Sequence, residues 1–275
     1  MIKCENYLRY FKKYTDEYFT LVAPEDKFKI ELKVIHTLNV LKIMRRLAKE
    51  VGLTGEEYEL AKIVALFHDF GRFNQIKVYG TFNDRASINH AEESVREMQR
   101  LNILDKTNDT YVPEYEKELI YKAILNHNRD EIVGENDELL ITLSKLIRDA
   151  DKIDIYRAIA RQMGNVEMND FKKSLEGYTD DLYIREEILD KVKKLIKLKR
   201  DDIVTIGDDT VWDFYWSISD MNYPISLKIL KEKGYIEEMF DVYSKTGKFP
   251  YDGTNKEAYD FIIKEFYKRV ENGTL

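Results

Sequence analysis

Apolar residues recur every three to four positions along most of this chain, and few helix-breaking residues interrupt the pattern. The 275 residues include only four prolines and twelve glycines, which leaves little turn chemistry. Residues 27–51 show the pattern clearly, with apolar side chains at Ile30, Val34, Leu38, Leu41 and Met44. Spacing of this kind predicts long amphipathic helices, so we expect an all-α fold.

Other helices are expected at residues 55–70, 88–101, 114–126 and 137–160. Thr54 and Glu57 form a capping-box pattern at the start of the first of these. Gly71 is interpreted as its ending residue, and Ser87 as the N-cap of the second. Residues 72–86 contain glycine, asparagine and aromatic residues without a period. This composition predicts a loop.

The C-terminal part has no linker rich in proline or serine before it. It has helical spacing, with a basic stretch at 191–200 that predicts a charged helix face. An aromatic stretch at 212–223 indicates a core or a subunit interface, the latter in a homo-oligomer. We expect residues 1–165, with a core at about 27–160, to carry the chemistry. Residues 166–275 are predicted to pack on them as a helical extension of the same compact unit.

Composition indicates a cytoplasmic protein with no membrane partner. The longest apolar run, Ile63–Phe67, is too short to span a bilayer, and the first residues lack the apolar segment of a signal peptide. The single cysteine, Cys4, excludes an internal disulfide framework. The formal net charge is −7, whereas proteins that bind nucleic acids usually have a basic excess. Large nucleic acids are therefore disfavoured as partners.

All four histidines lie in the first half of the chain, and one of them is followed directly by an aspartate. A further aspartate, Asp151, lies within a helix that is otherwise apolar, where a buried charge needs a metal or a cation. Imidazole nitrogen and carboxylate oxygen together suit zinc, iron and manganese. A single histidine on an apolar helix face is more often a core residue than a metal ligand. Six ligand-type residues in order, including every histidine of the chain, are much harder to explain as core residues. The candidate ligands are His36, His68, Asp69, His90, His127 and Asp151.

The order of these residues resembles the H…HD…D signature of the HD-domain phosphohydrolase superfamily. His36, His68-Asp69 and Asp151 stand at its positions, and residues 150–154 are similar to its last element, A-D-[RK]-[IL]-D. The intervening histidines match the six-ligand branch with two metals. HD-GYP-like, diadenosine-polyphosphate-cleaving and mixed-valent diiron members share that branch. The resemblance covers residues 27–160.

This resemblance implies two divalent transition-metal ions, with iron, manganese, zinc, nickel or cobalt as candidates. By analogy, His36, His68, Asp69 and Asp151 hold the first ion. Asp69 then bridges to a second ion, which His90 and His127 hold. A hydroxide activated by these metals would cleave a phosphate ester or anhydride of a small molecule. The first candidate for that substrate is a nucleotide.

Several further residues are predicted to act at the same site. Arg72 follows Asp69 by three positions and is expected to clamp phosphate, although it could instead face a helix end. Asp154, one turn after Asp151, is predicted to orient a ligand or a water. Predicted substrate-binding residues besides Arg72 are Gln75, Arg129 and Lys152, each with ordinary solvation as the alternative.

Two other functions stay open on the sequence. A diiron oxygenase would use the same six ligands for oxygen chemistry. A non-catalytic, nucleotide-sensing module of the same type would be expected to have lost ligands, whereas all six positions are filled here. The phosphohydrolase hypothesis is therefore the leading one.

Overall fold

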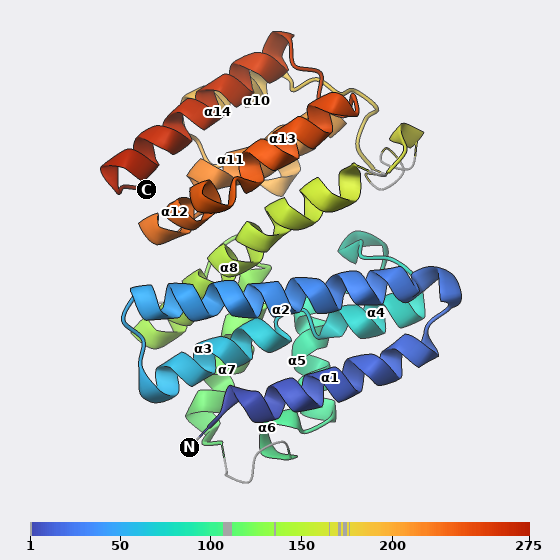
Figure 1. The fold of residues 1–275 in the computed structure, drawn as a ribbon, viewed down its shortest axis with the longest axis vertical. Coiled ribbons are helices and arrows are strands. Elements are labelled where there is room, and N and C mark those ends of the chain that lie inside the picture. Colours follow the sequence, from blue (N-terminus) through green and yellow to red (C-terminus); the bar gives the residue numbers. More distant parts are fainter. Residues whose placement is uncertain are drawn as a thin grey trace. The chain divides into compact units, whose positions relative to one another are not determined.

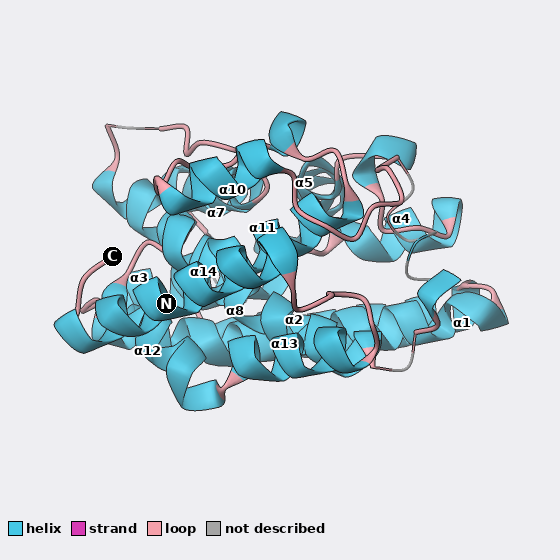
Figure 2. Cartoon of the chain, turned by 90° about the horizontal axis from the view of Figure 1, so that it is seen from above, coloured by secondary structure: helices cyan, strands magenta, loops and turns pink. Residues whose placement is uncertain are grey.

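The computed structural model of this chain describes residues 2–106, 112–134, 136–164, 166–169, 172, 175 and 177–275. In these residues the regular structure is helical, without a β-strand, and an isolated bridge pairs Thr179 with Thr205. Figure 2 shows helices joined by loops. The predicted all-α fold is therefore confirmed. None of the helices in this part of the chain combines the length and the apolarity that crossing a membrane would require.

The chain divides into two compact units, Met1–Asp151 and Lys152–Leu275, and the boundary falls inside one helix, α8. The first unit contains α1 (Cys4–Leu21), η1 (Pro24–Asp26), α2 (Lys27–Glu50), α3 (Gly55–Phe67), α4 (Gly71–Tyr79), η2 (Asp84–Ala86), α5 (His90–Arg100), α6 (Ile103–Lys106), α7 (Glu114–His127) and the start of α8 (Glu138–Met163). The second contains the rest of α8, α10 (Glu186–Lys193), η3 (Arg200–Asp202), α11 (Ile206–Ser219), α12 (Pro224–Lys233), α13 (Tyr235–Lys245) and α14 (Gly253–Asn272). The expected packing of residues 166–275 with residues 1–165 as one unit stays a prediction.

Helix α3 forms the centre of the first unit. Every residue from Leu60 to Phe67 is buried, as expected for a helix that is apolar on nearly all sides. It packs against α1, α2 and α7, and Figure 1 shows it running beside α2. Rings of α1, including Phe11 and Tyr14, pack against Phe67 and Phe70. This packing holds the C-terminal end of α3 in place, and the candidate ligands His68 and Asp69 directly follow that end.

The second unit has an aromatic core between α11, α13 and α14. The ring centroid of Phe214, in the aromatic stretch, lies 5.3 Å from that of Tyr259. The Tyr259 ring stacks on that of Phe240, with 3.9 Å between their centroids. The aromatic stretch therefore contributes to a core, one of the two roles expected. The charged helix predicted over residues 191–200 is wrong beyond Lys193, because α10 ends there and Leu195 takes a positive φ.

The loop predicted at residues 72–86 is also wrong, because it contains α4 and η2. Gly71 begins α4 and does not end α3, and the helix ends at Gly80, where φ is 65°. Phe73 and Ile76, three positions apart, form its buried face. This face is too short to stand out from the glycine and asparagine around it.

Two predicted caps differ in the structure. Helix α5 begins at His90, and its N-cap is Asn89 and not Ser87. The Asn89 side chain accepts hydrogen bonds from the backbone of Ala91 and Glu92. Thr54 does occupy the N-cap position of α3, but its side chain makes no capping hydrogen bond.

Candidate metal centre

All six candidate ligands lie in the first unit, although they come from distant parts of the sequence. His36 lies in the middle of α2, while His68 and Asp69 directly follow α3. The remaining ligands are His90 at the first position of α5, His127 at the last position of α7, and Asp151 in α8. All are buried except Asp151, whose side chain is 17% exposed.

The first cluster consists of His36, His68 and Asp69, whose ligand atoms lie within 4.8 Å of one another. The two Nε2 atoms are 3.3 Å apart, and Asp69 Oδ2 lies 3.6 Å from that of His36 and 3.7 Å from that of His68. Asp151 Oδ1 approaches the same nitrogens at 3.0 and 3.7 Å. Four groups therefore converge on one point.

The second cluster consists of Asp69, His90 and His127. The two Nε2 atoms are 3.0 Å apart, and Asp69 Oδ1 lies 3.5 Å from that of His90 and 3.9 Å from that of His127. Asp69 therefore presents one carboxylate oxygen to each cluster. This is the arrangement expected of a carboxylate that bridges two ions.

Hydrogen bonds fix which nitrogen faces the centre in the rings of His68, His90 and His127. His68 Nδ1 donates to the carbonyl of Ala65 at 2.8 Å, and His127 Nδ1 donates to that of Ile124 at 2.5 Å. A carbonyl oxygen only accepts, so both Nδ1 atoms carry the proton and both Nε2 atoms present lone pairs. His90 Nδ1 is 2.6 Å from Asp84 Oδ2, which orients that ring in the same way.

This donor set requires a positive charge between the rings. Two Nε2 lone pairs facing each other at 3.0 Å repel unless a cation lies between them. A proton is disfavoured there, because burial and the nearby His90 and His68 rings lower the pKa of His127 to about 3. Neutral imidazoles beside an ionised carboxylate are good ligands for divalent transition metals. The residues present therefore fit two such ions.

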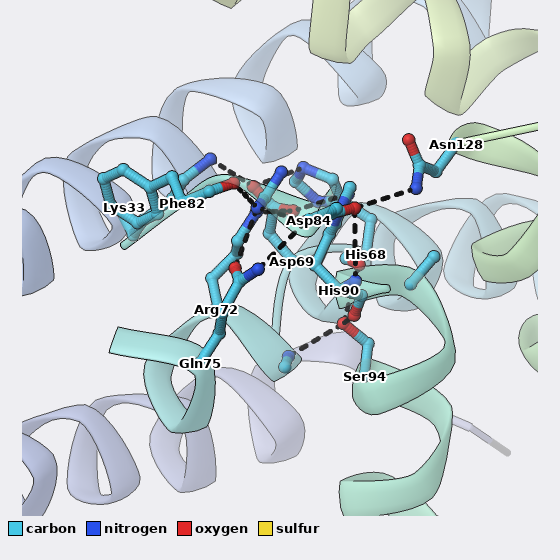
Figure 3. Close-up of polar contacts among 12 residues, drawn as sticks. Lys33, His68, Asp69, Arg72, Gln75, Phe82, Asp84, His90, Ser94 and Asn128 are labelled. Atoms are coloured by element: carbon cyan, nitrogen blue, oxygen red, sulfur yellow. Dashed lines mark hydrogen bonds and ion pairs between the residues drawn. The ribbon is translucent and has the colours of Figure 1, made fainter. Parts of the chain in front are cut away.

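Asp69 is ionised in this environment. Burial alone raises the pKa of its carboxyl, but the positive charges of Lys33 and Arg72 more than offset this and hold that pKa well below its ordinary value. Lys33 was not predicted from the sequence. Its Nζ lies 2.5 Å from Asp69 Oδ2. Figure 3 marks this contact with a dashed line. No local signal separates this lysine from the others of α2.

Arg72 connects Asp69 to the segment that contains Phe82 and Asp84, between α4 and α5. Its Nη1 donates to the Phe82 carbonyl at 2.6 Å, to Gln75 Oε1 at 2.8 Å and to Asp84 Oδ1 at 2.8 Å. Its Nε lies 3.5 Å from Asp69 Oδ1 and is buried without a hydrogen-bond partner. The guanidinium therefore lies beside the Asp69 carboxylate, with a buried Nε donor that its neighbours leave unsatisfied.

Gln75, predicted to bind substrate, is fully buried, and its side chain forms hydrogen bonds with residues 84–88. Its Nε2 lies 2.9 Å from Asp84 Oδ1, 2.8 Å from Ser87 Oγ and 3.1 Å from the Ile88 carbonyl. Its Oε1 accepts from Arg72. Since three acceptors share its two N–H groups, the amide has no donor left for a substrate.

The other three predicted site residues have contacts elsewhere. Arg129 is exposed and reaches Asn126 at 3.4 Å. In the second unit, Lys152 Nζ lies 5.8 Å from the Trp216 ring, and Asp154 accepts two hydrogen bonds from Arg157, at 2.6 and 2.8 Å. None of these contacts involves a candidate ligand.

Asp84 is the main support of the second cluster that sequence reasoning did not assign. Besides His90 and Arg72, it accepts from Asn128 Nδ2 at 3.3 Å (Figure 3). Burial raises the pKa of the Asp84 carboxyl, but the hydrogen bond from His90 and the positive charge of Arg72 lower it below its ordinary value. An ionised Asp84 increases the basicity of the His90 ring.

We therefore expect Asp84→Asn to weaken the second metal position by about 10- to 100-fold, as is typical for loss of a carboxylate that orients a ligand histidine. The first cluster contains no Asp84 contact, so its affinity is the internal control. Chelator competition with the wild type and with Asp84→Asn measures the metal affinity of each position. Equal weakening of both positions would show that Asp84 acts on the fold and not on His90.

Residues 34–156 match a family model described as the HD domain. The matched segment contains all six candidate ligands. No curated protein and no solved structure matches the chain.

Proposed function

We propose that the HD domain at residues 34–156 makes this chain a metal-dependent phosphohydrolase that cleaves a phosphate ester or anhydride of a small molecule, with a nucleotide as the first candidate. The observation that carries the proposal is the shared carboxylate of Asp69. Its two oxygens face two separate histidine clusters, each built of ligand atoms within 4.8 Å of one another. A pair of adjacent divalent ions is suited to in-line displacement at phosphorus.

When bound, the two ions would supply a hydroxide nucleophile and neutralise charge on the phosphoryl oxygens. The chain's own residues set the geometry. His68, His90 and His127 keep their Nε2 atoms directed inward through their Nδ1 hydrogen bonds. Asp151 adds a carboxylate oxygen to the first cluster.

Positive charge beside the ligands favours phosphate chemistry over oxygen chemistry. Lys33 and Arg72 flank Asp69, at 2.5 and 3.5 Å from its two oxygens. Phosphoryl transfer depends on fixed positive charge near the transferring group. A diiron oxygenase needs the six ligands but has no comparable need for two such cations.

The test is to load the purified protein with manganese or cobalt under strict anaerobiosis and to measure phosphate release from a panel of nucleotides and phosphate esters. We expect turnover that requires metal. Oxygen uptake by the iron-loaded protein without phosphate release from any substrate would instead establish the oxygenase. Nucleotide binding without turnover in any metal form would establish the sensing module.

Arg72→Ala should lower kcat/KM for a phosphate substrate by about 30- to 1,000-fold, or about 2–4 kcal/mol, because it removes a preorganised donor beside the reacting centre. Bound metal at saturation should stay unchanged, since a guanidinium cannot coordinate a cation. Steady-state kinetics with elemental analysis measures both. Arg85→Ala is the matched control, because Arg85 is an exposed arginine of the nearby η2.

If Arg72→Ala loses metal at saturation, the residue acts by holding Asp84 and Asp69. Wild-type kinetics in the variant would exclude the phosphate-clamp role.

A further inference from the structure

Lys33 occupies the side of Asp69 that faces the first cluster. It lies in α2, three positions before His36, and its Nζ is 2.5 Å from Asp69 Oδ2. The same oxygen is 3.6 Å from His36 Nε2 and 3.7 Å from His68 Nε2. An ion held by the first cluster would therefore use the oxygen to which the Lys33 ammonium is already bound.

The Lys33 ammonium has a second contact, with the aromatic ring of Phe82, which is not a candidate ligand. It lies 5.3 Å from the centroid of the Phe82 ring, and the Arg72 guanidinium lies 5.7 Å from the same centroid. An aromatic face attracts a cation through its quadrupole. The Lys33 side chain is 19% exposed, whereas that of Asp69 is 3% exposed. The ammonium is thus at the outer side of the carboxylate, near the loop that carries Phe82 (Figure 3).

A divalent ion and an ammonium cannot share one carboxylate oxygen without strong repulsion, because buried charges are poorly screened. The lysine side chain has a flexible four-carbon stem and can move, whereas the His68 ring of the first cluster is fixed by its Nδ1 hydrogen bond. Binding in the first cluster therefore weakens the Lys33–Asp69 ion pair, and by linkage the ion pair weakens binding in the first cluster to the same extent.

We propose that Lys33 competes with the first metal ion for Asp69 and, once displaced toward Phe82, binds an anionic oxygen of the substrate. The second half of this proposal rests on the proposed phosphohydrolase function. The competition itself does not, because it concerns only metal binding. The chain thus couples metal loading to the appearance of a free positive charge at the site.

The experiment compares Lys33→Gln with Lys42→Gln in the full chain. Lys42 is an exposed lysine of the same helix, so it controls for loss of one positive charge from α2. Manganese affinity is measured by chelator competition. Inorganic phosphate is then titrated into manganese-saturated protein whose metal content has been confirmed by elemental analysis.

We expect Lys33→Gln to bind the first manganese ion about tenfold more tightly than the wild type, and phosphate about tenfold more weakly. Lys33→Arg, which keeps the charge, should restore phosphate binding. Lys42→Gln should match the wild type in both titrations. Unchanged manganese affinity in Lys33→Gln overturns the competition. Unchanged phosphate affinity, or no phosphate binding by the wild type, overturns the anion-binding role.

A second measurement needs no substitution and no turnover. Amine labelling of wild-type protein, followed by peptide mass spectrometry, reports how accessible each lysine is. Lys33 should become more reactive when manganese is added, while Lys42 should not change. Equal labelling of Lys33 with and without manganese overturns the displacement. Failure of the proposed function would appear separately, as absence of phosphate release by the metal-loaded wild type.

Discussion

Asp69→Ala should remove both metal ions and lower kcat/KM for any phosphate substrate by at least about 1,000-fold, the scale of losing a main electrostatic element of a catalytic site. Asp69 contributes one oxygen to each cluster, whereas every other ligand faces only one of them. Its loss also leaves Lys33 and Arg72 beside the centre without the carboxylate that balances them. Elemental analysis and steady-state kinetics, with circular dichroism as a check on folding, test this expectation.

Two variants make the result specific. His127→Ala should empty only the second position and leave a slow enzyme with one metal, because His127 belongs to the second cluster alone and lies near the Oδ1 atom of Asp69. Asp16→Ala, at an exposed position of α1, should behave as the wild type. If Asp69→Ala keeps more metal than His127→Ala, the carboxylate does not bridge and the dinuclear centre is wrong.

The ligands could be predicted because their chemistry shows in the sequence itself. Histidines are few in this chain, and all four meet at one place in the structure. His36 lies within the helical apolar spacing of residues 30–44, and His68 and Asp69 directly follow the apolar run Ile63–Phe67. These inferences depend on local spacing, which a sequence states directly.

The supporting residues could not be predicted in the same way, because their roles depend on how a non-periodic segment folds. Gln75 and Asp84 are polar residues between two helices, and either could face a substrate or another part of the protein. Only the positions of α4 and η2 show that Gln75 holds Asp84, and that Asp84 holds His90. Lys33 is one of several lysines in α2, and its role depends on a contact 36 residues away along the chain.

The role of Gly71 could not be predicted from the sequence either, because a glycine can end a helix or allow two helices to pack closely. In the structure it begins α4 where α4 crosses α5. A Cβ atom added there would lie 2.5 Å from the Ser94 backbone nitrogen and 2.6 Å from the His90 carbonyl oxygen. The Gly71 amide also donates to Ser94 Oγ, which lies 2.9 Å from the His68 carbonyl oxygen. This contact holds the His68-Asp69 segment against the start of α5.

Gly71→Ala should therefore destabilise the protein by roughly 3 kcal/mol, at the upper end of the usual cost of overpacking, because the clash is with backbone atoms that no side-chain rotation relieves. Denaturant unfolding measures the loss. Gly164→Ala is the matched control, because its added Cβ would meet nothing nearer than 3.8 Å.

The same substitution should also affect the two metal positions unequally. Separation of α4 from α5 moves His90 away from Asp69, while His36, His68 and Asp151 come from other elements. The second ion should therefore be lost at metal concentrations that still saturate the first. Equal affinity at both positions in folded Gly71→Ala would mean that the contact at Gly71 supports the fold but does not position His90.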